Sequence, residues 1–388
     1  MRLLAITIVV ITAAFVVSGQ SGRVRIPDVP KEETPGLGND DSFFPYLYLS
    51  RSEKSFKDAA DAEAKLAKYT RIIEKGQANV PVAYNNRAVV YADLGRYELA
   101  LTDLEQALAS HVNDLVVLNN EGYVLLQSGH VAEAITKFDK CLEIDPKDAT
   151  ALGNRATALQ AAGQDGNALD ALNKAIAAND KEAMLYNNRG MLYFAAGNFA
   201  AAQADLEQAL ELDPRLGTAY SNLGEIYNVR GEWDKAVDMG ARAIAAEPRM
   251  PFGYTNRGLA YYRLGKMDKA LSDFNKAIEL DPKMPRAYNN RANIYIDRKD
   301  YPAARRDIDI AIQLDANDPS SYNTRGNLFM YTEDYRSAIV DYTKALELNP
   351  KMIGCYKSRA IAYDELGDKA RAAADRKKYL EMGGNLEP

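Results

Sequence analysis

Residues 251–284 read PFGYTNRGLAYYRLGKMDKALSDFNKAIELDPKM, and residues 285–318 repeat the pattern as PRAYNNRANIYIDRKDYPAARRDIDIAIQLDAND. The same 34-residue unit recurs nine times between residues 81 and 386 without an insertion. Repeats 1 to 9 begin at Pro81, Leu115, Ala149, Ala183, Gly217, Pro251, Pro285, Pro319 and Ile353. A fixed period of this length predicts stacked units that bury their apolar faces against one another.

Each repeat is predicted to be two antiparallel helices. Four repeats begin with Pro, which suits the first turn of a helix. Position 15 of the repeat is Gly in seven of nine, which predicts the end of the first helix. Position 20 is Ala in all nine repeats and position 8 is always Gly or Ala. Small residues at both positions predict a close approach of the two helix backbones.

Large residues at positions 4 and 11, Gly at 15, Ala at 20 and 27, and Pro at 32 together resemble the tetratricopeptide repeat. The resemblance covers residues 81–386. It implies an all-α, right-handed superhelical solenoid of nine helix–turn–helix repeats whose first helices line a concave groove. It also implies a non-enzymatic scaffold or adaptor that binds a protein or peptide partner, without identifying that partner.

The N-terminus is expected to be an export signal. Residues 3–17 carry no charge and lie between Arg2 and the small residues Ser18 and Gly19, which is typical of a signal peptide over residues 1–19. We therefore expect export, to the bacterial periplasm, with no membrane contact after the signal is removed. The alternative is an N-terminal membrane anchor facing the periplasm, although the stretch is shorter than the ~20 residues a spanning helix needs.

The segment between the signal and the array is divided in two. Residues 20–57 are rich in Pro and Gly and are expected to be a linker. Residues 58–80 have a helical pattern and are expected to form a degenerate half-repeat that caps the first repeat.

Composition argues against several classes of function. The formal net charge is −6, without the basic clusters that neutralise phosphates, so we expect no nucleic-acid partner. Two cysteines and two histidines lack the spacing of metal ligands, and no catalytic motif is visible. We therefore expect no metal, no cofactor and no catalytic residues.

Position 7 is usually Arg and position 23 is usually Asp, and we expect the two side chains to pair inside each hairpin. Six repeats follow this rule: Arg87–Asp103, Arg189–Asp205, Arg257–Asp273, Arg291–Asp307, Arg325–Asp341 and Arg359–Asp375. Repeat 2 swaps the signs as Glu121 and Lys137, and repeat 5 has Leu223 and Met239. Only Arg155 lacks a charged residue at position 23, and Asp170 lies beside that position. The alternative is a row of arginines that holds an acidic partner.

Position 6 carries an amide in seven consecutive repeats. The asparagine row consists of Asn86, Asn120, Asn154, Asn188, Asn222, Asn256 and Asn290, and position 5 adds Asn85, Asn119, Asn187 and Asn289. An Asn side chain can donate to and accept from a peptide backbone, so these residues are the predicted peptide-binding site. The row resembles the asparagine ladder of O-linked N-acetylglucosamine transferases, whose catalytic activity is not expected here. The alternative is that these amides bond only to the adjacent helix.

Two further possibilities concern the ligand and the assembly. Phe194, Tyr262, Met330 and Tyr331 are placed to receive apolar side chains of a ligand in the groove, or else to pack within the array. A structural role, in which the solenoid self-assembles into a homo-oligomer, is the alternative to a scaffold that binds another protein.

Overall fold

The computed structural model describes residues 57–76, 80–109 and 114–384, and the expected signal peptide lies outside these ranges. The described residues form nineteen α-helices and no strand. The helices are α2 (Ala59–Glu74), α3 (Val80–Asp93), α4 (Tyr97–Leu108), α5 (Leu115–Gln127), α6 (Val131–Ile144), α7 (Ala149–Ala161), α8 (Asp165–Ala178), α9 (Ala183–Ala195), α10 (Phe199–Leu212), α11 (Gly217–Val229), α12 (Trp233–Ala246), α13 (Pro251–Arg263), α14 (Met267–Leu280), α15 (Pro285–Asp297), α16 (Tyr301–Leu314), α17 (Pro319–Tyr331), α18 (Tyr335–Leu348), α19 (Ile353–Glu365) and α20 (Lys369–Glu381). The predicted all-α repeat architecture is confirmed, because α3 to α20 are nine consecutive helix pairs.

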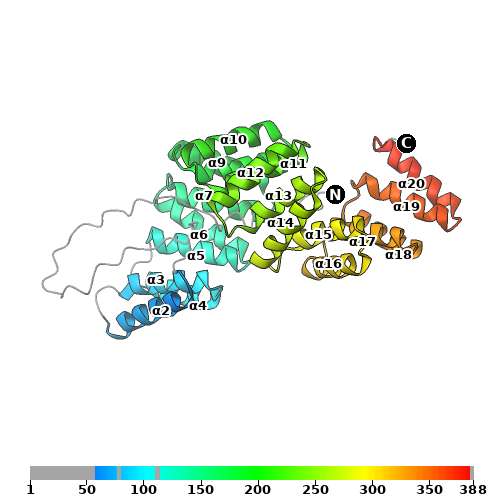
Figure 1. Cartoon of the computed structure of the whole chain (residues 1–388). Coiled ribbons are helices and arrows are strands. Elements are labelled where there is room, and N and C mark those ends of the chain that lie inside the picture. Colours follow the sequence, from blue (N-terminus) through cyan, green and yellow to red (C-terminus); the bar gives the residue numbers. More distant parts are fainter. Residues whose placement is uncertain (1–56, 77–79, 110–113, 385–388) are drawn as a thin grey trace. The chain divides into compact units, whose positions relative to one another are not determined.

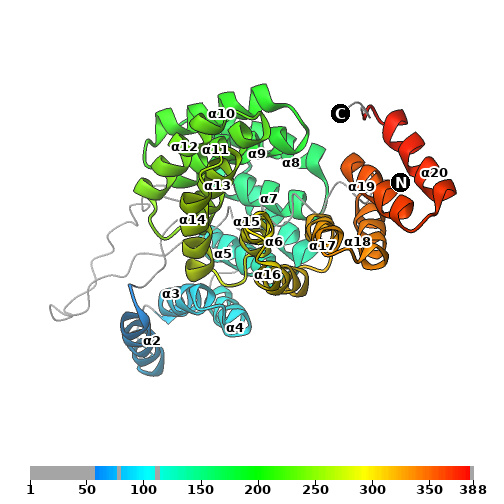
Figure 2. The same ribbon diagram turned by 45° about the vertical axis from the view of Figure 1, so that its right-hand side comes forward.

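The chain divides into two compact parts, which we describe separately. The N-terminal part ends at Ala219 and the C-terminal part begins at Tyr220. Figure 1 labels helices of both parts. In both parts a first helix packs against the second helix of its own repeat, which packs in turn against the first helix of the next repeat (Figure 2). Some first helices also contact one another directly: α3 with α5, α5 with α7, α13 with α15, α15 with α17, and α17 with α19. Helix α2 packs against α3.

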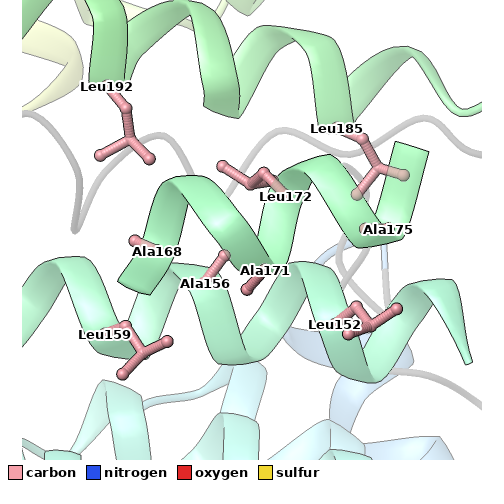
Figure 3. Packing of buried hydrophobic residues seen from close by; sticks show 9 residues of the cluster. All are labelled: Leu152, Ala156, Leu159, Ala168, Ala171, Leu172, Ala175, Leu185 and Leu192. Carbon is pink, nitrogen blue, oxygen red and sulfur yellow. The ribbon is translucent and has the colours of Figure 1, made fainter. Parts of the chain in front are cut away.

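Most core clusters join one hairpin to a neighbouring helix, and one joins α2 to α3. In the N-terminal part, Leu152 and Leu159 of α7, Leu172 of α8, and Leu185 and Leu192 of α9 form one buried cluster (Figure 3). Small residues fill the space between α7 and α8, and the Ala at position 20 is fully buried in all nine repeats. One hairpin alone would leave these leucines in water, so the repeats stabilise one another.

Position 8 lies opposite position 24 within the hairpin, and in six of the nine repeats the sizes of the two side chains are matched. Gly122 lies against Phe138, Gly258 against Phe274, and Gly326 against Tyr342, so closely that a Cβ would stand 2.6–2.8 Å from the ring. In three other hairpins Ala at position 8 faces an aliphatic residue at position 24: Ala88 with Leu104, Ala156 with Leu172, and Ala292 with Ile308. The remaining hairpins depart from this pattern, with Gly190 and Leu206, Gly224 and Gly240, and Ala360 and Arg376.

The turn inside the hairpin has a left-handed residue at position 15 in all nine repeats. Seven of these residues are Gly, as the sequence predicted, with φ between 71° and 88°. The other two are Lys299 and Glu333, each with φ of 61°. The turn therefore keeps its backbone conformation even where the side chain opposes it.

Within the described ranges, every helix is too short or too polar to traverse a lipid bilayer.

Candidate functional site

The predicted Arg–Asp pairs are confirmed and occupy the arginines that could otherwise hold an acidic partner. In all six pairs the guanidinium Nε and Nη2 donate to the two carboxylate oxygens at 2.6–2.8 Å. In five of the six pairs, Tyr side chains at positions 4 and 11 flank the guanidinium, as Tyr254 and Tyr261 do for Arg257 at 5.8 Å from each ring centroid. The reversed pair of repeat 2 is also present, with Lys137 Nζ 2.7 Å from Glu121.

The same arginines also reach the preceding repeat, which the sequence did not predict. Nη1 of the position-7 arginine donates to the residue at position 25 of the repeat before it. These cross-repeat bonds are Arg189 to Asn173 at 2.8 Å, Arg291 to Asn275 at 2.7 Å, Arg325 to Asp309 at 3.2 Å and Arg359 to Thr343 at 2.9 Å. In α2, Thr70 accepts in the same way from Arg87 at 2.9 Å.

Repeat 3 shows how the exception to the pairing rule is resolved. Arg155 donates to Asp139, the position-25 residue of repeat 2, at 2.5 Å. Its ionic partner therefore belongs to the neighbouring repeat and not to its own hairpin, where Asp170 lies next to position 23.

The asparagine row is mostly buried. Asn86, Asn120, Asn154, Asn222 and Asn256 are buried, whereas Asn188 and Asn290 are half-buried. The position-5 residues Asn85, Asn119, Asn187 and Asn289 are buried as well. Most of these amides therefore lie between helices, and their part in ligand binding stays a prediction.

Two junctions show what the buried amides contact. Asn120 Nδ2 donates to Asn85 Oδ1 at 2.9 Å, and Asn256 Nδ2 donates to the carbonyl oxygen of Ser221 at 2.9 Å. Both bonds join position 6 to position 5 of the preceding repeat. The bond to the adjacent helix, which was the alternative interpretation, is thus formed at these two junctions.

Polar side chains from three first helices converge in the C-terminal part. Arg286 of α15 reaches past α13 to Glu225 of α11, with Nη1 2.8 Å from the carboxylate. Asn290 lies one helical turn beyond Arg286 on α15, and Asn228 lies one turn beyond Glu225 on α11, so each asparagine shares a helix face with one member of this ion pair. Asn228 Nδ2 also donates to the carbonyl oxygen of Asn256 at 2.9 Å. We call this set the α11–α15 polar face.

Several buried amide atoms at or beside this face have no hydrogen-bond partner among the described residues. They are Asn228 Oδ1, Asn256 Oδ1, Asn289 Oδ1 and Asn290 Nδ2. A buried polar atom without a partner costs about 1–3 kcal/mol, so such atoms in a native fold call for a water or a ligand. Sequence reasoning missed Glu225 and Asn228, because positions 9 and 12 vary between repeats and show no periodic signal.

The cysteines are suited to packing and not to nucleophilic chemistry. Cys141 and Cys355 are buried, and burial raises the pKa of their thiols to about 12 and about 11 respectively. Cys141 is fully buried at position 27, where most other repeats have Ala. Across residues 57–76, 80–109 and 114–384, His, Cys, Asp and Glu form no group that could hold a metal ion.

Sequence comparison identifies one kind of repeat along the chain. Profiles described as Tetratricopeptide repeat match residues 79–147, 119–183, 181–247, 251–284, 274–306 and 319–352. No curated protein sequence matches the chain.

Solved structures show the same fold. The human IFIT1 dimer with m7Gppp-AAAA is similar at a TM-score of 0.56 and 18% identity, over 84% of this chain and 87% of that one. The Cut9–Hcn1 hetero-tetramer of the APC/C is similar at 0.60 and 14%, over 82% and 79%. A tetratricopeptide repeat protein from Parabacteroides merdae is similar at 0.50 and 22%, over 68% and 99%. At such identities the similarity concerns the fold and not the ligand.

Proposed function

Because the chain belongs to the tetratricopeptide repeat family, we propose that it is a non-catalytic scaffold that holds an extended segment of a partner protein. The binding site is the α11–α15 polar face of the C-terminal part. The partner is a protein of the cell envelope, reached by export through residues 1–19, and not a nucleic acid.

The observation that carries this proposal is the set of amide atoms without partners. The atom without a partner is an acceptor in Asn228, Oδ1, and a donor in Asn290, Nδ2. Both side chains are only half-buried. A rotation of either amide brings its atom to the surface, where a peptide unit offers one N–H and one C=O. Hydrogen bonds of this kind recognise the backbone of the partner segment, so the segment can carry many different side chains.

The asparagine row contributes to this proposal in a narrower form than the sequence predicted. Of its seven members, only Asn188 and Asn290 are half-buried, and only Asn290 lies on the α11–α15 polar face. Asn120 and Asn256 instead bond to the preceding first helix and help to hold these helices in register.

The test is capture of partners from a cell-envelope extract by the full chain and by two double variants. Asn228→Ala with Asn290→Ala removes the amides of the face, and Asn167→Ala with Asn317→Ala removes two exposed amides elsewhere. Circular dichroism melting first establishes that all three proteins are folded alike. We expect a partner that the first variant loses and the control retains. Equal capture by all three proteins would overturn the proposed site.

A further inference from the structure

Four side chains gather where helices α13, α15 and α17 end. The phenol of Tyr262 donates to Asp297 Oδ2 at 2.8 Å. The ring of Tyr331 stacks on Tyr301, with centroids 6.4 Å apart and planes inclined by 16°. Asp297 and Tyr331 are at the equivalent position, 13, of two first helices that contact each other, α15 and α17, which brings the two pairs together. We call Tyr262, Asp297, Tyr301 and Tyr331 the tyrosine–aspartate cluster.

The phenol of Tyr262 holds the carboxylate of Asp297 in place. Burial and the bond to Asp297 raise the pKa of Tyr262 to about 12, so the phenol remains a donor at neutral pH. Asp297 is exposed, and 61% of the Tyr331 side-chain surface faces solvent. A charged group from outside can therefore reach both the carboxylate and the ring.

The interior of the chain shows what this combination of groups binds. Arg291 lies between Tyr288 and Tyr295, 5.6 and 5.8 Å from their ring centroids, and bonds to both oxygens of Asp307. Two Tyr rings and one Asp carboxylate also surround four other arginines: Arg87, Arg189, Arg257 and Arg359. Two tyrosine rings and one aspartate are thus this protein's recurrent arginine-binding arrangement.

The tyrosine–aspartate cluster has the rings and the carboxylate, and an arginine beside it, Arg263, acts on the pKa of Tyr262 without an ion pair to Asp297. Among the described residues, no Lys or Arg forms an ion pair with Asp297. Arg298, its neighbour in the chain, bonds instead to Asp268 at 2.5 Å. The cluster is therefore an arginine-binding arrangement that no arginine of the described chain occupies.

Packing does not account for the exposed ring. Tyr331 is at position 13, where the other eight repeats have Asp93, Gln127, Ala161, Ala195, Val229, Arg263, Asp297 and Glu365. None of these residues is aromatic, so the hairpin folds without a ring at this position. Tyr331 is placed where a binding role explains it and a core role does not.

We infer that the tyrosine–aspartate cluster binds an arginine side chain of the partner protein. The guanidinium stacks on Tyr331 and donates to Asp297, as the internal arginines do with their own tyrosines and aspartates. Arg is favoured over Lys because its planar group both stacks and forms paired hydrogen bonds. This inference rests on the proposed function and adds to it one side chain of the partner.

The test uses two fluorescent peptides that differ only in charge. The probes are acetyl-Ser-Gly-Arg-Gly-Ser and the same peptide with citrulline, which keeps the shape of arginine and removes its charge. Fluorescence anisotropy measures their binding to the full chain. We expect the arginine probe to bind about tenfold more tightly, and we expect Tyr331→Ala and Asp297→Asn each to abolish that preference. The control, Asp234→Asn, removes another exposed carboxylate of the C-terminal part without releasing an arginine beside Asp297, and it should preserve the preference.

The outcomes separate this inference from the proposed function. Equal affinity for the two probes, or a preference that survives in Asp297→Asn, would overturn the arginine site. Absence of binding by either probe would overturn it too. The proposed function would be untouched by these results, because partner capture through Asn228 and Asn290 is measured independently.

Discussion

Lys299 and Glu333 hold a left-handed conformation in the turns of repeats 7 and 8, where seven other repeats have Gly. For a residue other than Gly, the left-handed conformation destabilises the folded state by about 1 kcal/mol relative to Gly. We therefore expect Lys299→Gly and Glu333→Gly each to raise the free energy of unfolding by about 0.5–1 kcal/mol. Urea denaturation measures the free energy of unfolding. As a control, Lys276→Gly places Gly inside α14 and should lower that free energy by about 1 kcal/mol. A loss of stability in the turn variants would contradict this account of the turn.

The glycines at position 8 differ in what a methyl group would meet. At Gly258 an added Cβ would stand 2.8 Å from Phe274 Cε1, whereas at Gly224 its nearest neighbour is Met239 Cβ at 3.5 Å. We expect Gly224→Ala to stabilise the protein by about 0.5–1 kcal/mol, because it lowers the backbone entropy of the unfolded chain without a clash. Gly258→Ala should destabilise it by about 1–3 kcal/mol through overpacking. Equal melting temperatures for the two variants would show that the difference in space does not matter.

At the scale of the hairpin, the Arg–Asp pair joins two helices at a half-buried site. Removing the carboxylate of Asp273 leaves the guanidinium of Arg257 among two tyrosines without a counter-charge, which we expect to cost about 2–3 kcal/mol. The double variant Arg257→Leu with Asp273→Met copies the uncharged pair of repeat 5, Leu223 and Met239, and should cost less. Thermal melting of Asp273→Ala and of the double variant decides the matter. Equal melting temperatures would mean that the pair has no energetic role.

Contacts within one hairpin could be predicted from sequence, because the turn at position 15 fixes which residues of the two helices face each other. The Arg257–Asp273 pair is an example. Contacts between hairpins could not, because they depend on the angle at which neighbouring units pack. For this reason the partner of Arg155 proved to be Asp139, in the preceding repeat.

At the candidate site too, features within one helix could be predicted from the sequence, whereas contacts between repeats could not. Helical periodicity placed the asparagine row on one side of the first helices, but it cannot say how near the next first helix comes. The close approach of first helices buries Asn120 and Asn256 and gives their amides partners in the preceding repeat. Glu225 and Arg286 lie in different repeats, 61 residues apart, so only the packed array reveals that they meet.

For the whole array, cohesion depends on bonds between repeats. Arg257 is a position-7 arginine that has Ala241 at the preceding position 25, where Arg291 has Asn275. We expect Ala241→Asn to supply the missing cross-repeat bond and to stabilise the C-terminal part by about 0.5–1 kcal/mol. Hydrogen exchange should slow in α12, which carries the new side chain. In an Arg257→Leu background the same substitution should have no such effect, and slowing there would contradict the proposed bond.

The size match between positions 8 and 24 also constrains how recombination can change the number of repeats. Gly326 requires the ring of Tyr342 to fill its side of the hairpin, and Ala292 requires the smaller Ile308. A genetic crossover within the turn would join the first helix of one unit to the second helix of another. It would set a methyl group against a ring or leave a void beside a glycine. Duplications and exchanges that respect the boundary between hairpins carry both members of the match together. Exchange in whole units is therefore the change that the six matched hairpins tolerate best, and it fits nine repeats without a single inserted residue.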